Sequence, residues 1–382
     1  MCSKRDKNMD KSKKPVFDRL KPFNNLPKLP VDIQLDSELL LKWGYASRAL
    51  AELNRNIQRL PNPTMLINTL SIREAKSSAE IENIFTTEDE LYKAISDTVK
   101  EERANPATKE VLRYREALWE GYTQLVKVGE LKIKAVVAIH KKVKNTTQGI
   151  RPPQSLTFIK RGESEFRSGE VIYTPPRGKG IIEDKMNNLL KFLNDEKFSD
   201  LDPLLKMCIG HGQFEAIHPF SDGNGRTGRI INLLYLVSQG LISQPVLYLS
   251  KYIIENKDDY YYHLGGLTQK GAWKKWILFM LEAVLKTSQH TNRLIDDIIN
   301  QMDATYIHGK EHLKWYNKEI NELLFYQPYC KAKLIGDAIE RSSRTTLTKY
   351  MADLISIGIL SSKQDGKEVY YVNNDLIRIL ED

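Results

Sequence analysis

Apolar residues recur at helical spacing through nearly every segment of this chain after residue 37, and strand-like alternation is scarce. A spacing of three and four residues gives each helix one apolar face, which is stable only when it packs against other helices. At 382 residues, the chain is also longer than one hydrophobic core normally supports. The sequence therefore predicts a mainly α protein with two or three domains.

Proline and N-cap signals divide the first third of the chain into helices. One helix is expected over residues 37–60, before the Pro-Asn-Pro of residues 61–63, and another over residues 65–85. Asn105 followed by Pro106 is an N-cap with proline at the first helical position, which begins a third helix. We expect four regions: a basic arm over residues 1–30, a helical region over 31–104, a helical core over 105–290 and a separate domain over 300–382.

One strand pair interrupts the helices. Two β-rich runs, residues 155–160 and 170–176, flank a polar loop that contains glycines, which predicts a β-hairpin. A two-stranded hairpin is barely stable alone in water, so this one must lean on another part of the protein.

After about residue 300 the pattern changes to helix, turn, helix and two short strands. This is the order of elements in a winged helix, which can bind DNA or protein. Arg341, Arg344 and Lys349 would lie on the segment that reads DNA, but residues 331–382 hold eight basic and eight acidic side chains. Because DNA-binding modules need a basic surface, protein binding or dimerisation is favoured over DNA binding.

Most of the net charge of +8 lies in the first 28 residues, which hold nine Lys or Arg and three Asp. Together with the prolines that follow, this composition predicts a solvated, poorly ordered arm. No apolar run approaches the roughly 20 residues that a membrane span needs, and the charged start does not resemble a signal peptide. We therefore expect a cytoplasmic protein with no membrane contact, in which Cys2, Cys208 and Cys330 are free thiols.

Residues 218–229, HPFSDGNGRTGR, precede a segment that is apolar around its whole circumference. That segment must be a buried helix, whose N-terminus falls near Gly223 or Asn224. Arg226 and Arg229 would then lie in the first two turns, where the helix dipole is already positive. This unfavourable placement becomes reasonable when an anion binds over the helix end.

The same twelve residues supply the groups that an anion site needs. Backbone N–H groups of Gly223, Asn224 and Gly225 can hold an anion at the helix N-terminus. Arg226 and Arg229 share one helical face and lean back toward that N-terminus. We therefore expect both guanidinium groups to reach the same phosphate-sized site.

His218 and Asp222 complete the constellation. Pro219 keeps His218 in a loop, where an imidazole of ordinary pKa is suited to general-base catalysis. Asp222 can cap the helix or present a carboxylate oxygen to Mg²⁺ that bridges phosphates. Together these groups indicate transfer of a phosphorus group from a nucleotide to a nucleophile that His218 deprotonates. His211 and Glu215, at helical spacing, are interpreted as core residues rather than metal ligands.

The twelve residues match the HxFx(D/E)GNGRxxR signature of Fic proteins, and a less specific resemblance extends over residues 105–285. Fic proteins have a helical core with a β-hairpin flap, and most transfer AMP from Mg·ATP to a hydroxyl of a target protein. The resemblance implies that His218 is the general base, Phe220 the anchor of the loop and Asp222 the Mg²⁺ ligand. The implied nucleotide contacts are Gly223, Asn224, Gly225, Arg226, Thr227, Gly228 and Arg229.

Further roles follow from the same resemblance. Arg226 is similar to the residue that steadies the loop and the phosphates, and Arg229 to the γ-phosphate contact. Tyr261 and Tyr262 resemble residues that pack against the adenine, although three consecutive tyrosines permit a slip by one position. The hairpin is similar to the flap that holds a target backbone by strand addition, here through Val171, Ile172, Tyr173 and Thr174.

Residues 78–83, SAEIEN, are similar to the inhibitory (S/T)xxxE(G/N) helix of many Fic proteins. Ser78, Glu82 and Asn83 stand at the defining positions. A carboxylate from Glu82 on Arg229 would take the place of the γ-phosphate and turn ATP away from its reactive pose. The resemblance thus implies a protein adenylyltransferase that restrains itself.

Several alternatives stay open at this point. The same site could transfer another phosphate-containing group, or remove AMP with Glu82 aligning a water. A winged helix could instead make the chain a DNA-binding or protein-binding regulator. The expected partners are ATP, Mg²⁺ and a target protein with a Ser, Thr or Tyr hydroxyl, the chain itself included. A homodimer is a further candidate, and DNA is the less favoured partner.

Overall fold

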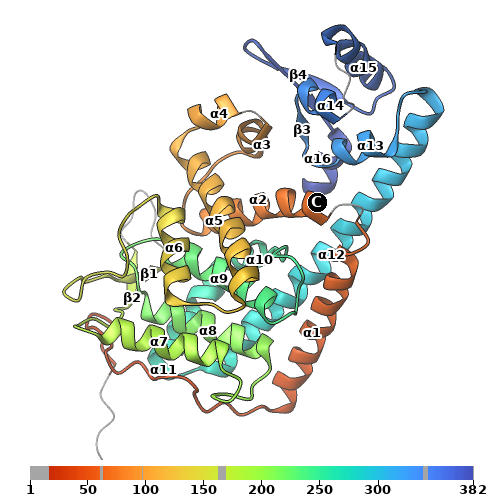
Figure 1. The fold of residues 1–382 in the computed structure, drawn as a ribbon. Coiled ribbons are helices and arrows are strands. Elements are labelled where there is room, and N and C mark those ends of the chain that lie inside the picture. Colours follow the sequence, from red (N-terminus) through yellow and green to blue (C-terminus); the bar gives the residue numbers. More distant parts are fainter. Residues whose placement is uncertain (1–16, 61–62, 97, 162–168, 339–342, 382) are drawn as a thin grey trace, which may run out of the picture.

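The computed structural model describes residues 17–60, 63–96, 98–161, 169–338 and 343–381. Helices dominate it, as the periodicity predicts, and two small antiparallel sheets complete it (Figure 1). The helices up to the middle of the chain are α1 (Ser37–Ile57), α2 (Pro63–Ile81), α3 (Glu88–Ser96), α4 (Thr98–Arg103), α5 (Pro106–Val128), α6 (Ile133–Lys144), α7 (Ile181–Asn194) and α8 (Pro203–Ile217). The later helices are α9 (Asn224–Ser238), α10 (Leu249–Glu255), α11 (Lys257–Lys270), α12 (Trp273–His312), α13 (Lys318–Leu324), α14 (Ala332–Ala338), α15 (Arg344–Ser356) and α16 (Asn374–Glu381). The strands are β1 (Ile159–Arg161), β2 (Glu170–Tyr173), β3 (Tyr329–Cys330), β4 (Ser361–Asp365) and β5 (Glu368–Val372).

Helix α9 lies in the core and packs against α2, α5, α6 and α8 (Figure 1). Its side chains are buried from Arg226 to Leu236, which confirms the buried helix expected after the motif. Gly223 takes a left-handed conformation (φ 74°) directly before the first helical residue, Asn224. The N-terminus of α9 therefore falls where the sequence predicts it.

Helix α12 is 40 residues long and passes without a break through residues 290–300, where the sequence analysis ends the core and begins a separate domain. Asn292 accepts a hydrogen bond from Asn56 of α1, and further along Gln301 donates to Asp375 of α16. The core and the C-terminal module therefore share one helix. The helix continues because buried apolar side chains recur along it on both sides of residues 290–300.

The C-terminal module contains α14, α15 and a three-stranded sheet of order β3-β5-β4. β4 and β5 form the hairpin that the sequence predicts, with Ser361 opposite Val372. β3 was not predicted, since a strand of two residues has no pattern. The sheet contacts α3 of the N-terminal region, where the Tyr329 hydroxyl donates a 2.7 Å hydrogen bond to Asp89.

The flap hairpin is present but short. β1 and β2 pair antiparallel, with Lys160 opposite Val171. The side chain of Gln269 on α11 donates to the carbonyl of Ile172, so β2 leans on the core as a two-stranded hairpin requires. The loop at its tip, residues 162–168, lies outside the described residues.

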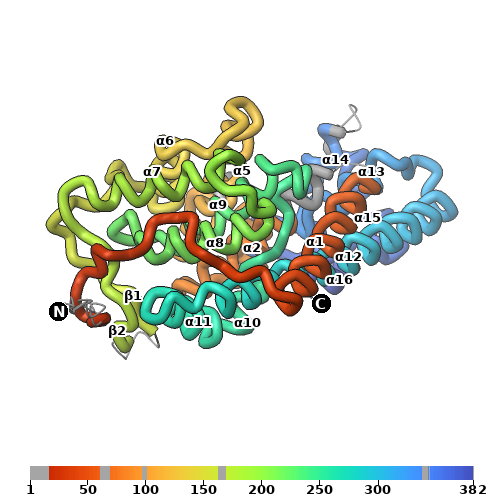
Figure 2. Tube along the Cα trace, turned by 90° about the horizontal axis from the view of Figure 1, so that it is seen from below, coloured from red at the N-terminus to blue at the C-terminus, as the bar shows by residue number. Residues whose placement is uncertain are grey.

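The described part of the N-terminal arm, residues 17–30, is anchored to the core, although most of its side chains are exposed as its composition predicts. It runs past the flap and along α7 (Figure 2). The N–H of Phe23 donates to the carbonyl of Thr174 at 3.0 Å, and Lys185 of α7 donates to the carbonyl of Leu26. Lysines and prolines dominate the composition, but a few apolar residues provide the packing. The most buried are Leu26 and Leu29.

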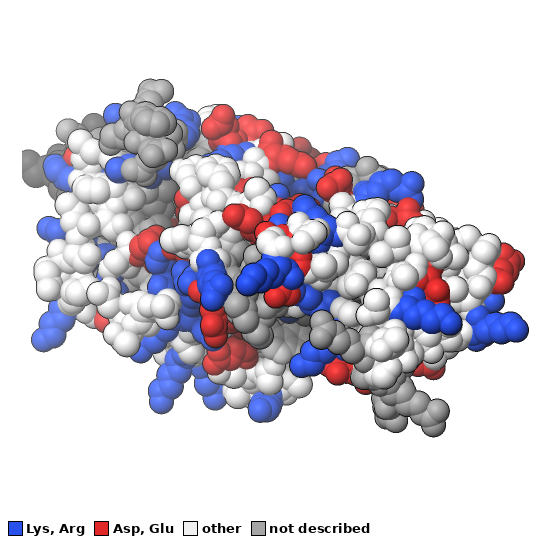
Figure 3. Space-filling view, turned by 90° about the horizontal axis from the view of Figure 1, so that it is seen from above, with Lys and Arg blue, Asp and Glu red and all other residues white. Residues whose placement is uncertain are grey.

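Three general expectations can be compared with the described residues. None of their helices is long and apolar enough to cross a membrane. Cys208 and Cys330 are buried free thiols, as expected, while Cys2 lies outside the described part of the chain. On the face in Figure 3, basic and acidic side chains are interspersed among the described residues rather than gathered by sign. A DNA-binding face would instead concentrate basic side chains, which the described residues on this one face do not do.

Candidate active site

The loop between α8 and α9 holds His218 in a left-handed backbone conformation (φ 51°, ψ 62°). Its N–H donates to the carbonyl of Phe214, which ends α8. Phe220 is fully buried and stacks on His140 of α6, with 3.8 Å between ring centroids. The Asn224 side chain bonds both the N–H and the carbonyl of Phe220 at 2.8 Å. Packing and hydrogen bonds therefore fix the loop that presents His218.

Two glycines of the motif let other elements approach α9 closely. A Cβ at Gly225 would overlap the carboxylate of Glu82. A Cβ at Gly228 would lie 2.7 Å from Glu215 Oε1 on α8. Gly225 therefore opens the N-terminus of α9 to a carboxylate, whereas Gly228 serves the packing of α9 on α8.

The carboxylate of Glu82 lies in the position expected for an anion. Arg229 is only 1% exposed, and its Nη2 donates to Glu82 Oε1 at 2.8 Å. The same guanidinium donates from Nε to Ser78 Oγ and from Nη2 to the Ser78 carbonyl, each at 2.8 Å. The end of α2 therefore satisfies the charge and several donors of Arg229.

Asn83 shapes the end of α2. It takes a left-handed conformation (φ 60°), and its N–H and that of the next residue donate to the carbonyls of Glu80 and Ala79. These bonds form a Schellman motif, which ends the helix earlier than predicted and makes Glu82 its C-cap residue. The Asn83 side chain also accepts a 3.0 Å hydrogen bond from Lys257 of α11.

Arg226 does not reach the same site as Arg229, contrary to the prediction from their shared helical face. Its Nη1 lies 2.5 Å from Glu110 Oε2 on α5, and the arginine side chain is buried. The two guanidinium groups diverge because carboxylates from different elements meet them. Arg226 thus ties α9 to α5. One residue on, the buried Thr227 hydroxyl donates to the carbonyl of Gly223.

Asp222 lies at the edge of the loop with an exposed carboxylate. Lys144 Nζ is 2.6 Å from Asp222 Oδ2, and the N–H of Gly223 donates to Oδ1 at 2.6 Å. Desolvation would raise the pKa of Asp222, but the bond and charge of Lys144 lower it, so the carboxylate is ionised at neutral pH.

The donor set of this loop fits Mg²⁺ held together with phosphates. Mg²⁺ commonly takes one or two carboxylates and completes its shell with water and phosphate oxygens. The exposed carboxylate of Asp222 beside the N-terminus of α9 meets that need. Within the described ranges there is no cluster of three or more His, Cys, Asp or Glu that could hold a metal ion without a nucleotide.

His218 is a neutral base at physiological pH. Desolvation and the charge of Arg151 lower its pKa to about 4, against the opposing charges of Glu82 and Asp222. The sequence analysis expected an ordinary pKa, and the value is lower because the loop buries the ring. A neutral imidazole can accept a proton from a nucleophile.

The three consecutive tyrosines on α11 differ in exposure. Tyr260 is buried in the core, and Tyr261 packs edge-on against it with 5.3 Å between ring centroids. Tyr262 is 59% exposed. The side of α11 that carries Tyr261 also carries Lys257, four residues earlier, which contacts the end of α2.

The flap residues expected to dock a target are largely covered in this structure. Phe17 of the arm stacks on Tyr173 with an interplanar angle of 3°, and the Thr174 hydroxyl donates to the carbonyl of Arg19 at 2.6 Å. The N-terminal arm therefore occupies the C-terminal end of β2. Val171 is half-buried, and the buried members are Ile172, Tyr173 and Thr174.

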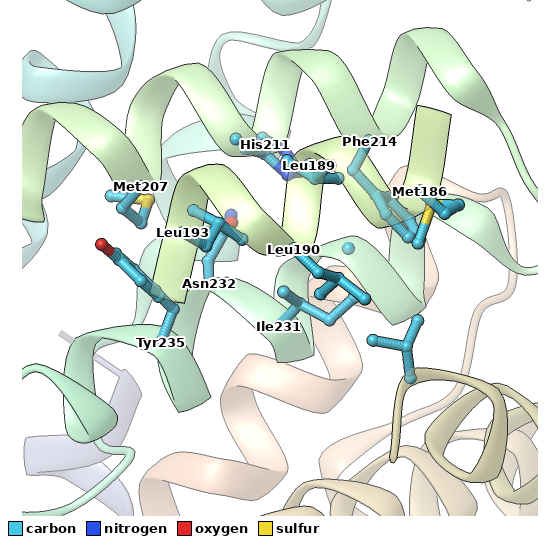
Figure 4. Close-up of a pocket in the computed structure, with 13 residues that line it drawn as sticks. Met186, Leu189, Leu190, Leu193, Met207, His211, Phe214, Ile231, Asn232 and Tyr235 are labelled. Carbon is cyan, nitrogen blue, oxygen red and sulfur yellow. The ribbon is translucent and has the colours of Figure 1, made fainter. Parts of the chain in front are cut away.

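His211 and Glu215 lie in the core of α8, as interpreted from their spacing. His211 Nε2 is 3.0 Å from the Tyr260 hydroxyl, and burial raises the pKa of Glu215 to about 8, so this carboxyl is protonated at neutral pH. His211 also lines a cavity between α7, α8 and α9, which encloses about 10 Å³ among mostly apolar side chains (Figure 4). Such a space holds about one water and no nucleotide.

Sequence analysis missed the residues that support the loop, because each comes from an element distant in the sequence. They are ordinary charged or aromatic residues, so no local spacing marks them. They are His140 beneath Phe220, Lys144 beside Asp222, Glu110 beside Arg226, Lys257 beside Asn83, and Arg151 on the flap side of His218.

Three family models match this chain in succession. The Fic/DOC family N-terminal model matches residues 40–123, and the Fic/DOC family model matches residues 130–236. A third model, the C-terminal domain of protein adenylyltransferase SoFic-like, matches residues 299–376.

Similar proteins carry the same family name. Protein adenylyltransferase Fic of Drosophila erecta is 29% identical over 166 residues, and that of Drosophila ananassae is 28% identical over 166 residues. Each match covers 43% of this chain and 30% of the relative, so the similarity spans less than a third of these longer proteins.

Solved structures support the fold. A Fic family protein from Desulfovibrio desulfuricans G20 aligns over 89% of this chain and 97% of that one, with a TM-score of 0.54 and 18% identity. Fic-1 (residues 134–508) from C. elegans aligns over 70% and 75%, with a TM-score of 0.50 and 18% identity.

Proposed function

Because this chain belongs to the Fic/DOC family, we propose that it is a protein adenylyltransferase restrained by Glu82. It would transfer AMP from Mg·ATP to a Ser, Thr or Tyr hydroxyl of a target protein. The observation that carries the proposal is the Glu82 carboxylate, which lies over Gly225 and against Arg229. An anion of the chain itself thus occupies the positive end of a buried helix, close to a neutral histidine.

His218 supplies the base of the proposed reaction. The target hydroxyl oxygen bonds to the α-phosphorus of ATP, the bond from this phosphorus to the β-phosphate breaks, and pyrophosphate leaves. His218 accepts the hydroxyl proton, for which its neutral state at physiological pH is required. The hydrogen bonds around Phe220 and Asn224 hold this base in place before the substrates arrive.

The N-terminus of α9 supplies the phosphate contacts. The N–H groups of Asn224 and Gly225 lie in its first turn, Gly223 would add its N–H once Asp222 releases it, and Arg229 adds a guanidinium beside Gly225. Arg226, held by Glu110, would steady this end of the helix. Asp222 would hold the Mg²⁺ ion, which when bound supplies positive charge to the phosphates. Lys144 would have to release Asp222 for this.

Glu82 restrains the enzyme because Arg229 cannot serve a carboxylate and a γ-phosphate in one place. While Glu82 stays, the triphosphate cannot take the pose that exposes its α-phosphorus to a target hydroxyl. The Schellman motif and Lys257 support this arrangement, since they fix the end of α2 next to Arg229.

The proposal is tested by intact-mass spectrometry of the chain after incubation with Mg·ATP and a cell lysate. Glu82→Gly is expected to form an AMP adduct, on itself or on a lysate protein, at least about tenfold faster than the unchanged chain, because a charge-assisted hydrogen bond that excludes ATP is removed. Adding His218→Ala should abolish the adduct. Glu80→Gly is the matched control, since this carboxylate faces Lys76 instead of Arg229.

The mass of the adduct also separates the alternatives. A phosphate adduct would replace AMP transfer by phosphate transfer, and a vigorous double mutant without His218 would end the general-base role. Absence of any adduct with Glu82→Gly would contradict the proposal. A protein first modified by Glu82→Gly and then mixed with the unchanged chain tests whether the restrained form removes AMP.

We further propose that the C-terminal module is a winged helix that contacts protein rather than DNA. Its equal numbers of acidic and basic residues and the docking of its sheet on α3 support this role. Lys349 of α15 is exposed, whereas Arg341 lies outside the described residues and the side chain of Arg344 is not described. A salt-dependent mobility shift of DNA by the whole chain would contradict the proposal.

A further inference from the structure

Arg151 is a buried arginine between the flap and the loop that carries His218. It is 2% exposed and lies in the segment between α6 and β1. Its Nε donates to the carbonyl of His218 at 2.8 Å, and its Nη2 donates to the carbonyl of Pro176 at 2.5 Å. Longer bonds run from Nη2 to the carbonyl of Ile217 (3.4 Å) and from Nη1 to that of Ser155 (3.3 Å).

The backbone of the same residue adds a further bond to the loop. The N–H of Arg151 donates to the carbonyl of Pro219 at 2.9 Å. Carbonyls of three successive residues, 217–219, therefore accept from this one arginine. They include the last carbonyls of α8, which no helical N–H can satisfy and where a cation is favourable.

These bonds hold a residue whose backbone conformation is strained. His218 has a left-handed conformation, which costs a residue with a Cβ about 1 kcal/mol or more. Side-chain donors that hold its carbonyl help to keep it there. At the other end of the guanidinium, Pro176 lies three residues after the last residue of β2, Tyr173, in the segment that leaves the flap. A planar fork can bridge the two segments, whereas the single ammonium of a lysine cannot.

Building on the proposed function, we propose that Arg151 is a positioning residue that locks the end of the flap and the backbone of His218 into one arrangement. A target hydroxyl presented along the flap would then meet the imidazole at a fixed distance. Arg151 itself bonds only backbone carbonyls in the described structure and touches no reacting group.

The charge of Arg151 affects the pKa of His218, which a residue that only packs against the loop would not do. After desolvation, it is the largest influence that lowers the pKa of His218, while the charges of Glu82 and Asp222 raise it. Neutralising residue 151 should therefore raise the pKa of His218, and keeping a positive charge there should not.

The experiment compares Arg151→Gln and Arg151→Lys with Arg177→Gln, an exposed arginine one residue beyond Pro176. The titration of His218 is followed by NMR in the full chain, with the signal assigned by its loss in His218→Asn. Arg151→Gln should raise the pKa of His218 by about one unit, while the other two variants leave it nearly unchanged.

Hydrogen exchange and kinetics complete the test. In both Arg151 variants, the amides of residues 171–174 and of Ile217, His218 and Phe220 should exchange faster together, because one bridge holds both segments. In the Glu82→Gly background, both should lower kcat at least about tenfold and leave the KM for ATP within about twofold. Arg177→Gln should match the parent throughout.

Three outcomes distinguish a failure of this inference from a failure of the proposed function. If Arg151→Gln titrates, exchanges and turns over like Arg177→Gln, the positioning role is overturned. If Arg151→Gln does not fold, Arg151→Lys still decides through exchange and kcat. If Glu82→Gly forms no adduct at all, the proposed function fails, but titration and exchange still decide the role of Arg151.

Discussion

The chemistry of this protein depends on the protonation state and the partners of two side chains. Desolvation lowers the pKa of His218 enough to keep it neutral at physiological pH, and Glu82 forms an ion pair with the buried guanidinium of Arg229. In the function we propose, the first side chain accepts a proton, and the second keeps the triphosphate of ATP from Arg229. Neither property follows from residue type alone, since most histidines and glutamates in proteins are structural or solvated.

The pKa of His218 predicts an unusual pH profile for AMP transfer. With a pKa of about 4, the neutral fraction of the imidazole is nearly complete from pH 6 to 8. The rate for Glu82→Gly should therefore be flat in this range, and loss of the Glu82 charge moves the pKa further down. If His218 had the ordinary histidine pKa of about 6.5, the rate of AMP transfer would fall to about half its maximum at about pH 6.5.

The measurement is the initial rate of AMP incorporation at saturating Mg·ATP between pH 5.5 and 8, a range chosen to bracket the ordinary value of about 6.5. ATP binding by His218→Ala over the same range separates ionisation of the nucleotide from that of the base. A half-maximal rate near pH 6.5 that is absent from the binding curve would show that His218 has an ordinary pKa.

At the scale of an element, the last turn of α2 determines where Glu82 points. Asn83 adopts a left-handed conformation that glycine tolerates and alanine does not. We predict that Asn83→Ala lowers the free energy of unfolding by about 1 kcal/mol, while Asn83→Gly changes it by only a few tenths. Asn83→Ala should also form some AMP adduct, because strain at this position weakens the ion pair between Glu82 and Arg229.

Urea denaturation of the two variants checks the stability difference, and intact mass checks the adduct. Both variants lose the hydrogen bond from Lys257, so any difference between them comes from the backbone. Equal stability of the two variants would mean that the Schellman turn does not hold the end of α2.

The sequence predicts α2 and the start of α9, because caps, glycines and apolar periodicity are local signals, but it places the end of α2 at residue 85 instead of Ile81. It does not predict that Arg226 turns to Glu110 on α5, since two arginines on one helical face have no local mark of divergence. Lys144 and Arg151 were missed for the same reason. Their partners, Asp222 and His218, are distant in the sequence and meet them only after the helices pack.

At the scale of the molecule, the C-terminal module contacts α3, the helix that follows α2. Asp89 on α3 accepts hydrogen bonds from Tyr329 of β3 and Lys363 of β4, both at 2.7 Å. Desolvation would raise the pKa of Asp89, but bonds from Lys363, Lys93 and Tyr329 lower it to about 2. The carboxylate therefore links two parts of the chain by ionic hydrogen bonds.

We predict that this link adds stability above about pH 4 and loses it as the pH falls from about 4 to about 2. The sign follows because the folded state binds the proton of Asp89 more weakly than the unfolded chain. Asp89→Asn should remove this part of the acid sensitivity, whereas Asp297→Asn, an exposed carboxyl of α12, should not. Urea unfolding at several pH values measures both, and identical pH dependences would contradict the link.

The whole-molecule arrangement is also where sequence analysis failed most. Composition predicts a solvated arm, yet Leu26 and Leu29 are buried and Phe23 bonds the flap. A C-terminal domain that begins near residue 300 stays a prediction, and α12 passes across that position because its buried face continues into the C-terminal module. Composition and periodicity carry no information about which distant surface covers a segment.

The central claim is that Glu82 and the triphosphate of ATP compete for Arg229 at the N-terminus of α9. Crystal structures of the unchanged chain and of Glu82→Gly, each soaked with Mg·ATP, test it most directly. We expect a phosphate against Gly225 and Arg229 in the variant, and Glu82 still on Arg229 in the unchanged chain. A variant whose triphosphate makes no contact with Arg229, or an unchanged chain with Glu82 and phosphate bound there together, would contradict the claim.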